Sequence, residues 1–233
     1  MPLRLEPVRD RKLWRLINSA PARATRKGEV LFRRGQPGGE VFLVQEGHVR
    51  LQLAGEGGAE RTVAVAGPSE LFGEEAMVPG ALRPYGAVAG ERGAVVTLDG
   101  ASVRAVLGTS HHTLTTYLEV KERDLHLLRS AATGSPGPSA RERLAGVILD
   151  LAERLGEPEG DGVRVPHWFT HRELADLAGA HRSTVTTSLN DWIWRGVIAT
   201  SGRALVLDRA GLAALARERD GGGDSVDRNP RQE

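Results

Sequence analysis

The stretch FTHRELADLAGAHRSTVTTSLNDWIWRGVI, residues 169–198, has the apolar spacing of two short helices separated by a glycine. Thr170, followed three residues later by Glu173, is the pattern of a capping box and predicts the start of the first helix. Gly179 is expected to end that helix, and the second is expected over about 181–195. The apolar residues expected to pack these helices are Leu174, Leu177, Ala178, Val185, Leu189, Trp192 and Ile193. Short helices joined by a tight turn that contains glycine predict a helix-turn-helix motif.

The outward positions of the second helix carry short polar side chains. In a helix-turn-helix the first residues of this helix enter the major groove of DNA, where an arginine can donate two hydrogen bonds to a guanine edge. Arg182 is therefore the main base-reading candidate, and Ser183 and Thr187 come next. The candidates for contacts to phosphates or neighbouring bases are Thr170, His171, Thr184, Thr186, Asn190 and Arg203.

A solvated helix face in an unrelated helical domain is the alternative explanation of these polar residues. The following sequence VIATSGRALVLD, residues 197–208, predicts two short strands around Ser201 and Gly202, a hairpin of the type called a wing. The capped first helix, the glycine turn and the hairpin together favour DNA binding over the alternative.

Upstream, the sequence SARERLAGVILDLAERLG predicts another capped helix. Ser139 is its expected N-cap, Glu142 completes a capping box, and Gly156 is expected to end it. The preceding sequence ATGSPGPSA, residues 132–140, contains two prolines and two glycines, through which no helix passes uninterrupted. We expect a hinge between domains over 134–139.

The segment 110–132 has a helical composition with apolar residues at the a and d positions of about three heptads. This spacing predicts a helix that pairs with its own copy. Lys121 weakens a purely hydrophobic seam, although one polar seam residue can fix the register. The alternative is an ordinary amphipathic helix that lies on the N-terminal domain. The predicted dimer-interface residues are Leu114, Leu118, Lys121, Leu125 and Leu128.

Short apolar runs alternate with glycine punctuation over about 27–106, which predicts an all-β barrel or sandwich. The run VFLVQEGHVRLQL alternates well after Gly47, and two antiparallel strands joined at Glu46 and Gly47 are expected there. One strand face would carry Val49, Leu51 and Leu53, and the other His48, Arg50 and Gln52.

Composition limits the classes of protein to consider. A chain of 233 residues with 40% hydrophobic and 26% charged residues is expected to form two domains. The chain contains no cysteine, which excludes disulfides, thiolate metal sites and cysteine-ligated iron–sulfur clusters within it. The amino terminus lacks a signal-peptide core and no apolar run reaches membrane-spanning length, so a cytoplasmic location without membrane contact is expected.

Over about 23–215 the sequence resembles the CRP/FNR family of bacterial transcription regulators. KGEVLFRRGQPGGEVFLVQEGHVRL is similar to the strand pattern of that family, and residues 169–198 are similar to its DNA-reading segment. The resemblance implies an α+β fold with a cyclic-nucleotide-binding-type β-roll, a dimerisation helix, a hinge and a winged helix-turn-helix. It implies turns at Gly28, Gly35 and Gly47, with Phe32, Phe42 and Val44 filling the roll.

Arg182 falls on the arginine that the family uses against a base edge. Many members that respond to cyclic AMP carry a glutamate directly after this arginine and another arginine four residues later. Here these positions are Ser183 and Thr187, which predicts a different operator sequence.

The expected domain limits are 1–109 for the β-roll, 110–133 for the dimerisation helix, 134–139 for the hinge, 140–217 for the DNA-binding domain and 218–233 for a disordered tail. The tail is rich in glycine and charged residues, a composition typical of disorder.

The resemblance also implies an effector pocket, in which a Gly-Glu pair and an arginine followed by serine or threonine hold a cyclic nucleotide. The candidates here are Gly73, Glu74, Arg83 and Tyr85. Pro84 replaces the hydroxyl residue and has no backbone donor for a phosphate. Counted back from the next strand, the position expected for the arginine falls on Pro84, one residue after Arg83. A shift of one residue reverses the strand face, so Arg83 is predicted to point away from the pocket unless the preceding loop is shorter by one residue. Three possibilities remain open: the protein acts without an effector, it binds cyclic AMP, or it binds another ligand. We favour the first.

We therefore predict a homodimeric transcription regulator that binds double-stranded promoter DNA at a palindromic site and contacts RNA polymerase, more often as an activator than as a repressor. The alternative is a ligand-binding signalling module that regulates a protein partner. No enzyme is expected, because Glu74 and Glu75 are adjacent and are accompanied by no nucleophile and no metal-binding constellation.

Overall fold

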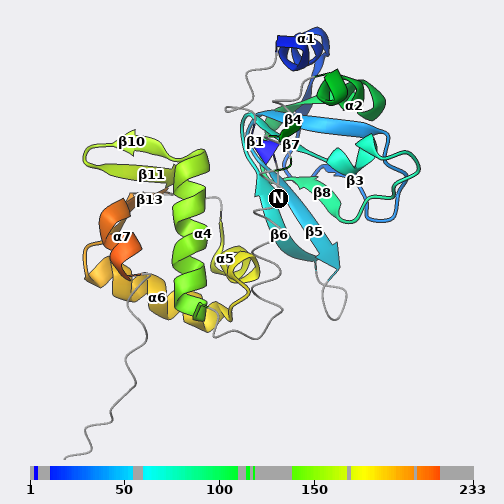
Figure 1. The fold of residues 1–233 in the computed structure, drawn as a ribbon. Helices are drawn as coiled ribbons and strands as arrows, with labels where there is room; N and C mark the ends of the chain where they lie inside the picture. Colours follow the sequence, from blue (N-terminus) through cyan, green and yellow to red (C-terminus); the bar gives the residue numbers. More distant parts are fainter. Residues whose placement is uncertain are drawn as a thin grey trace, which may run out of the picture.

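The computed structural model describes residues 3–4, 11–54, 60–109, 114–115, 118, 138–166, 169–201 and 204–215. A β-rich N-terminal lobe and a mainly helical C-terminal lobe lie beside each other (Figure 1). The α+β prediction is confirmed. Within the described residues, no helix is both long enough and apolar enough to span a bilayer.

The N-terminal lobe is a roll made of antiparallel sheets. One sheet has the strand order β1-β7-β4-β9-β2 and the other the order β3-β8-β5-β6. The strands are β1 (Leu3–Arg4), β2 (Ala22–Thr25), β3 (Val30–Phe32), β4 (Glu40–Glu46), β5 (Val49–Ala54), β6 (Glu60–Ala66), β7 (Glu70–Phe72), β8 (Gly86–Ala89) and β9 (Gly93–Asp99). Helices α1 (Arg11–Ser19) and α2 (Gly100–Thr109) pack against one sheet, and the short 3-10 helix η2 (Glu74–Met77) follows β7.

Consecutive strands β4 and β5 do not pair with each other, so the predicted hairpin at Glu46 and Gly47 is wrong. Strand β4 pairs with β7 and β9, whereas β5 pairs with β6 and β8. Gly47 has φ 74°, and a Cβ there would lie 3.1 Å from the carbonyl oxygen of Arg92. This left-handed glycine turns the chain out of one sheet and into the other, a topology that the local alternation of side chains does not encode.

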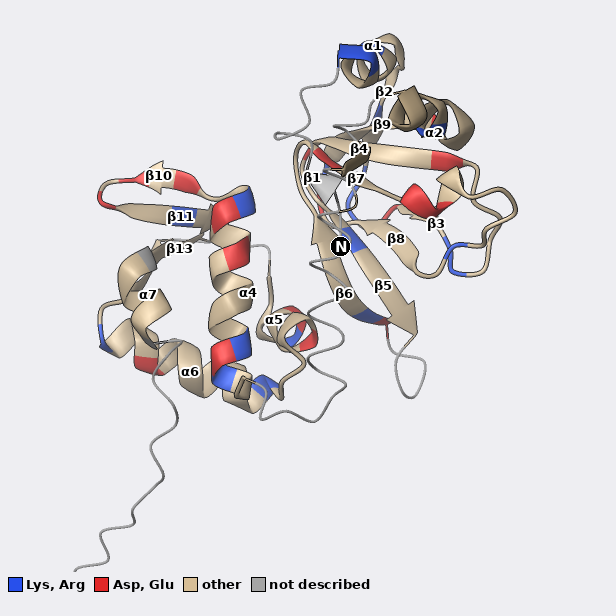
Figure 2. Ribbon diagram, in the orientation of Figure 1, with Lys and Arg blue, Asp and Glu red and all other residues tan. Residues whose placement is uncertain are grey.

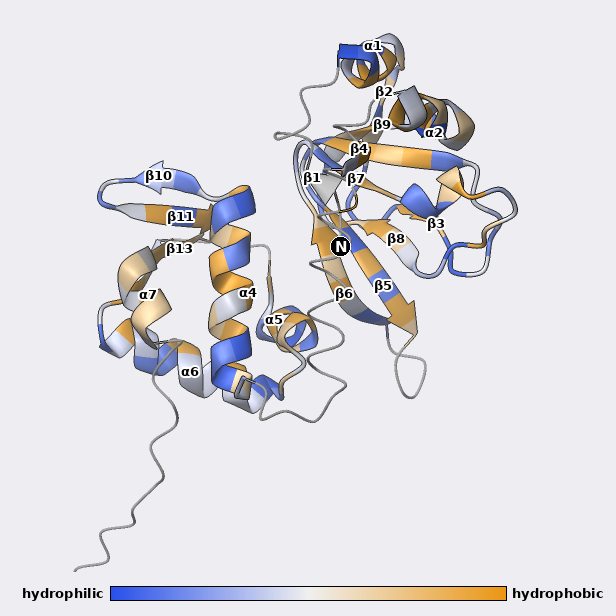
Figure 3. Ribbon diagram, in the orientation of Figure 1, coloured by the Kyte–Doolittle hydropathy of each residue, from blue (hydrophilic) through white to orange (hydrophobic). Residues whose placement is uncertain are grey.

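The predicted interior of the roll is confirmed. Phe32, Phe42 and Val44 are all buried in one apolar cluster. The Phe32 and Phe42 ring centroids lie 5.6 Å apart, and those of Phe42 and Phe72 lie 5.3 Å apart. Apolar residues follow β4 and β5 and one side of α4 (Figure 3).

The C-terminal lobe contains helices α4 (Ala140–Leu155), α5 (His171–Ala178), α6 (Arg182–Trp194) and α7 (Arg209–Leu215). Its sheet has the order β10-β11-β13-β12, with β10 (Glu157–Glu159), β11 (Gly162–Pro166), β12 (Ile198–Ser201) and β13 (Ala204–Leu207). Both predicted capping boxes, at Ser139 and Thr170, are confirmed. Strands β12 and β13 form the predicted wing.

The buried side of α6 was predicted correctly except at Ile193. Val185, Leu189 and Trp192 are buried, but Ile193 is 39% exposed. Ile193 follows Trp192 by one residue, about 100° around the helix, and is therefore turned away from the core. Trp194 is 86% exposed.

The predicted dimerisation helix is described only in part. Leu114 and Leu118 are helical and are 39% and 56% exposed. Lys121, Leu125 and Leu128 lie outside the described residues, as do most of the hinge and the tail. Their roles, and the domain limits, stay predictions.

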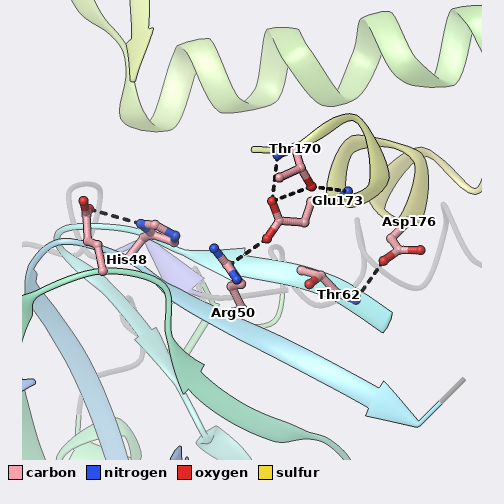
Figure 4. Close-up of polar contacts among 7 residues, drawn as sticks. His48, Arg50, Thr62, Thr170, Glu173 and Asp176 are labelled. Atoms are coloured by element: carbon pink, nitrogen blue, oxygen red, sulfur yellow. Dashed lines mark hydrogen bonds and ion pairs between the residues drawn. The ribbon is translucent and has the colours of Figure 1, made fainter. Parts of the chain in front are cut away.

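The lobes contact each other through β5, β6 and β7 on one side and α4 and α5 on the other. Arg50 Nε lies 3.0 Å from Glu173 Oε1, and the backbone N–H of Thr62 donates to Asp176 Oδ2 at 3.4 Å (Figure 4). Val65 of β6 belongs to the apolar core of the C-terminal lobe. The lobes therefore share apolar packing as well as ion pairs.

Candidate nucleic-acid interface

Both ends of α5 are fixed by local interactions. The Thr170 N–H donates to Glu173 Oε2 at 2.7 Å, and the Glu173 N–H donates to Thr170 Oγ1 at 3.2 Å. Gly179 ends α5 with φ 58°, the left-handed conformation that glycine adopts without a steric penalty. Helix α6 then begins at Arg182 with its N-terminus free of a side-chain cap.

Four predicted DNA-contacting side chains share the exposed side of α6. Arg182, Ser183, Thr187 and Asn190 are exposed, whereas Val185 is buried. Thr187 follows Ser183 by four residues and Asn190 follows Thr187 by three, so these three side chains share one face of the helix, while Arg182 lies about 100° from Ser183 in the first turn. Thr184 is half-buried beside them.

Thr186 has a different environment. Its hydroxyl donates to the carbonyl of Arg182 at 3.0 Å, and its Oγ1 lies 2.9 Å from His171 Nδ1. Because the hydroxyl hydrogen is directed to the carbonyl, the ring nitrogen of His171 is the donor in the second contact. The pair holds the first turn of α5 against α6, so Thr186 orients His171 within the motif.

The charge pattern of α6 suits an anionic partner. Its only charged residues are Arg182 near the beginning and Asp191 near the end (Figure 2). The Asp191 carboxylate accepts hydrogen bonds from Arg141 and Arg195, and the bond from Arg141 is the main reason that its pKa is lowered. Within the described residues, Arg182 makes no ion pair. Arg203, predicted in the wing, lies outside the described residues.

The candidate effector residues converge inside the roll. Arg83 is only 3% exposed, and its NH1 donates to the Gly73 carbonyl at 3.1 Å and to Glu75 Oε1 at 2.8 Å. Its NH2 donates to the Glu40 carbonyl at 2.6 Å. Tyr85 Oη accepts the Gly73 N–H and donates to Glu75 Oε2, both at 3.3 Å.

Arg83 is buried inside the roll, although the count along the strand predicted that it points away from the pocket unless the preceding loop was shorter. Arg83 precedes β8, which begins at Gly86, and its backbone pairs with the loop at Gln36 and Gly35. The alternation of faces counted back along β8 therefore does not extend to Arg83. The guanidinium carbon instead lies 4.1 Å from the centroid of the Phe32 ring.

Glu75 was missed as a site residue, and Glu74 lies beside it. Neighbouring residues diverge on a strand, but residues 74–77 form a 3-10 helix, which brings both carboxylates to one hollow of about 530 Å³ with Tyr85. Burial, together with the charges of Glu74 and Glu75, raises the pKa of Tyr85, so its hydroxyl remains a neutral donor. A glutamate next to the Gly-Glu pair was the available sequence signal.

Comparison with known proteins fits this arrangement. The family model for a cyclic nucleotide-binding domain matches residues 22–110, and that for a Crp-like helix-turn-helix domain matches residues 142–215. The CRP-like cAMP-activated global transcriptional regulator of Mycobacterium tuberculosis is 30% identical over 192 residues, which cover 82% of this chain and 86% of that protein. The chain belongs to the CRP/FNR family of transcription regulators.

Other CRP/FNR relatives agree along most of the chain. The cyclic AMP receptor protein of Thermus thermophilus is 33% identical over 177 residues, 74% of this chain and 76% of that protein. The crystal structure of a CRP/FNR-family transcriptional regulator from the same organism matches with a TM-score of 0.65 at 28% identity, covering 85% of this chain and all of that one. The chain with the present sequence is therefore a DNA-binding transcription regulator with a winged helix-turn-helix.

Proposed function

We propose that this regulator binds a palindromic promoter site as a homodimer, activates transcription by contacting RNA polymerase in the cytoplasm, and needs no small-molecule effector. The observation that carries the DNA-binding role is the exposed polar face at the start of α6, where Arg182 lies without an ion pair among the described residues. A flexible, fully charged guanidinium at this position can read a guanine edge with two hydrogen bonds.

The proposed contacts divide into base reading and backbone positioning. Arg182 reads a base in each half-site, and Ser183 and Thr187 read its neighbours. The residues proposed to contact phosphates or flanking bases are Thr170, His171, Thr184, Thr186, Asn190 and Arg203, with Thr186 acting mainly through its contact to His171.

Dimerisation is proposed through the helix that contains Leu114 and Leu118. These leucines expose apolar surface in the single chain, which a partner helix would cover. The proposed seam continues through Lys121, Leu125 and Leu128. Pairing of these helices would present two copies of α6 to successive major grooves about 34 Å apart.

Activation and the absence of an effector rest on different support. The Mycobacterium tuberculosis relative is described as cAMP-activated and as a global transcriptional regulator, which supports a transcriptional role and makes cyclic AMP the effector to test. The NH1 and NH2 groups of Arg83 and the Gly73 N–H, however, are already bonded inside the protein, which supports action without it.

The first experiment is selection of binding sites from a randomised DNA pool by the purified full-length protein, with and without cyclic AMP. We expect the same palindrome to be enriched in both arms, with an affinity that falls steeply as salt rises because phosphate contacts release counterions. A protein that enriches no sequence in either arm would contradict the proposal and favour a signalling module that acts on a protein partner.

On the selected site, Arg182→Ala should weaken specific binding by about 1 to 3 kcal/mol and relax the preference at one position of each half-site. Fluorescence anisotropy with single-base operator variants measures both effects. Arg164→Ala is the matched control, because it removes an exposed arginine from β11 of the same lobe. Unchanged selectivity in Arg182→Ala would show that another residue reads that base.

A further inference from the structure

The interior of the roll contains a closed network centred on Glu75. Its Oε1 accepts from Arg83 and its Oε2 accepts from Tyr85, so both carboxylate oxygens are bonded. Tyr85 in turn accepts the Gly73 N–H, and Arg83 also donates to the Gly73 carbonyl. The network therefore joins η2 to the segment before β8. It also holds Gly73 at both its N–H and its carbonyl.

Most of the donors that a phosphate would use are already bonded in this network, namely NH1 and NH2 of Arg83 and the Gly73 N–H, whereas the Nε–H of Arg83 is buried without a hydrogen-bond partner. An anionic ligand in a protein is held by charged and backbone N–H groups. Here the guanidinium of Arg83 is buried, lies against the Phe32 ring and faces the carboxylate of Glu75. The Gly73 N–H is directed to Tyr85, and Pro84 has no N–H to offer.

The hollow beside the network is also unfavourable for an anion. The hollow of about 530 Å³ outside the network is lined by Glu74, Glu75, Tyr85 and Arg104, together with apolar residues. Arg104 already donates to the Met77 carbonyl at 2.8 Å. A phosphate in this hollow would lie beside the carboxylates of Glu74 and Glu75 as well as the guanidinium of Arg104, and repulsion from the two carboxylates would oppose its binding. The residues present do not fit a cyclic nucleotide.

We propose that Glu75 is a tethered counter-ion that takes the place of an anionic effector beside Arg83, so that this roll binds neither cyclic AMP nor another phosphate ester. Glu75 is thereby the residue that determines the ligand specificity of the roll. Gly73 leaves space for the arrangement, since a Cβ there would lie 2.7 Å from Arg83 NH1. The proposal rests on the proposed function in one respect, because it explains why DNA binding would not need an effector.

The test compares the full-length wild type with Glu75→Gln and Glu75→Ala by isothermal titration calorimetry with cyclic AMP and by thermal unfolding. The wild type should show no saturable binding and no change in Tm. Both variants leave Arg83 without a carboxylate, so their Tm should fall in phosphate-free buffer and rise when cyclic AMP or inorganic phosphate is added. Their affinity for cyclic AMP should exceed that of the wild type by at least about tenfold.

Glu29→Ala is the matched control. It removes a carboxylate from an exposed ion pair with Arg23 in the same roll, and it should not respond to cyclic AMP. If a Glu75 variant does not fold in plain buffer, refolding with and without inorganic phosphate decides the question. Recovery only with phosphate supports a tethered counter-ion, and failure in both conditions overturns it.

Saturable binding of cyclic AMP by the wild type, or folded Glu75 variants that gain no anion affinity, would also overturn the proposal. These outcomes can be distinguished from failure of the proposed function. If the wild type enriches no DNA sequence, the DNA-binding role fails, while the response of the Glu75 variants to anions still reports on the roll.

Discussion

His48 is a buried histidine at the boundary between the lobes. Its Nδ1 lies 3.1 Å from Glu91 Oε1 (Figure 4), and its ring centroid lies 6.2 Å from that of Phe169. Arg50 and Glu173 also act on it electrostatically. Burial is the largest influence and lowers the pKa of His48, although the hydrogen bond to Glu91 opposes this shift. The native state therefore keeps His48 neutral at a pH where the unfolded chain protonates it.

This difference predicts a pH dependence of stability. As the pH falls below about 6.5, the unfolded chain binds a proton at His48 that the native protein does not, so the free energy of unfolding decreases. The stability contributed by neutral His48 is fully present above that pH. It decreases as the pH falls from there to the lowered native pKa, and the free energy of unfolding changes by at most about 1.4 kcal/mol per pH unit. Urea unfolding of the wild type and His48→Leu over this range measures it.

Below about pH 6.5, the free energy of unfolding of His48→Leu should depend less steeply on pH than that of the wild type. His181→Gln is the control, because His181 is exposed and makes no cap hydrogen bond through its side chain. Identical slopes in the wild type and His48→Leu would contradict a lowered pKa at this residue.

At single residues, sequence reasoning succeeded where one helix determines the environment. The helical period predicted correctly that Arg182 and Thr187 are exposed and that Trp192 is buried. It could not predict the inward direction of Arg83 or the role of Glu75, because both depend on a 3-10 turn and on loop contacts between segments distant in sequence.

Among the elements, helix boundaries were predictable and strand partners were not. A capping box is formed by residues three apart, so the sequence pattern contains the whole interaction. The partners of β4 and β5 come from strands far along the chain, and no local pattern specifies them. The C-terminal lobe, built mainly of capped helices, was therefore predicted more completely than the roll.

The capping box of α4 provides a test at this scale. The Glu142 N–H donates to Ser139 Oγ at 3.2 Å, and Ser139→Ala removes this bond. The free energy of unfolding should fall by about 1 kcal/mol. Gly146→Ala on the same helix is the matched comparison, because a Cβ there meets no atom within 4 Å and should raise stability by about 0.5 to 1 kcal/mol. Urea denaturation measures both changes, and a loss of stability in both variants would contradict this account.

In the whole molecule, the lobes are joined by a nearly buried ion pair. Glu70 of β7 is 2% exposed, and its carboxylate accepts from Arg154 Nε at 2.6 Å and NH2 at 2.5 Å. Glu70 Oε2 also accepts the Gly67 N–H at 2.9 Å. This geometry ties α4 of the DNA-binding lobe to the roll.

Removing one partner of this pair should be costly. Arg154→Leu leaves the Glu70 carboxylate buried without its cation, and we expect a loss of about 3 to 5 kcal/mol in the free energy of unfolding. Arg164→Leu breaks an exposed pair with Glu159 and should change stability by about 1 kcal/mol or less. Chemical denaturation compares the two, and equal effects would mean that the inter-lobe pair does not contribute as its burial implies.

The position of Val65 limits how this regulator can be recombined with others. Its side chain completes the apolar core of the DNA-binding lobe although it belongs to a strand of the roll. A chimera that joins this DNA-binding lobe to a foreign sensor at the hinge would therefore begin with a void where Val65 had been. A successful graft has to transplant the end of β6 together with the helices that it supports.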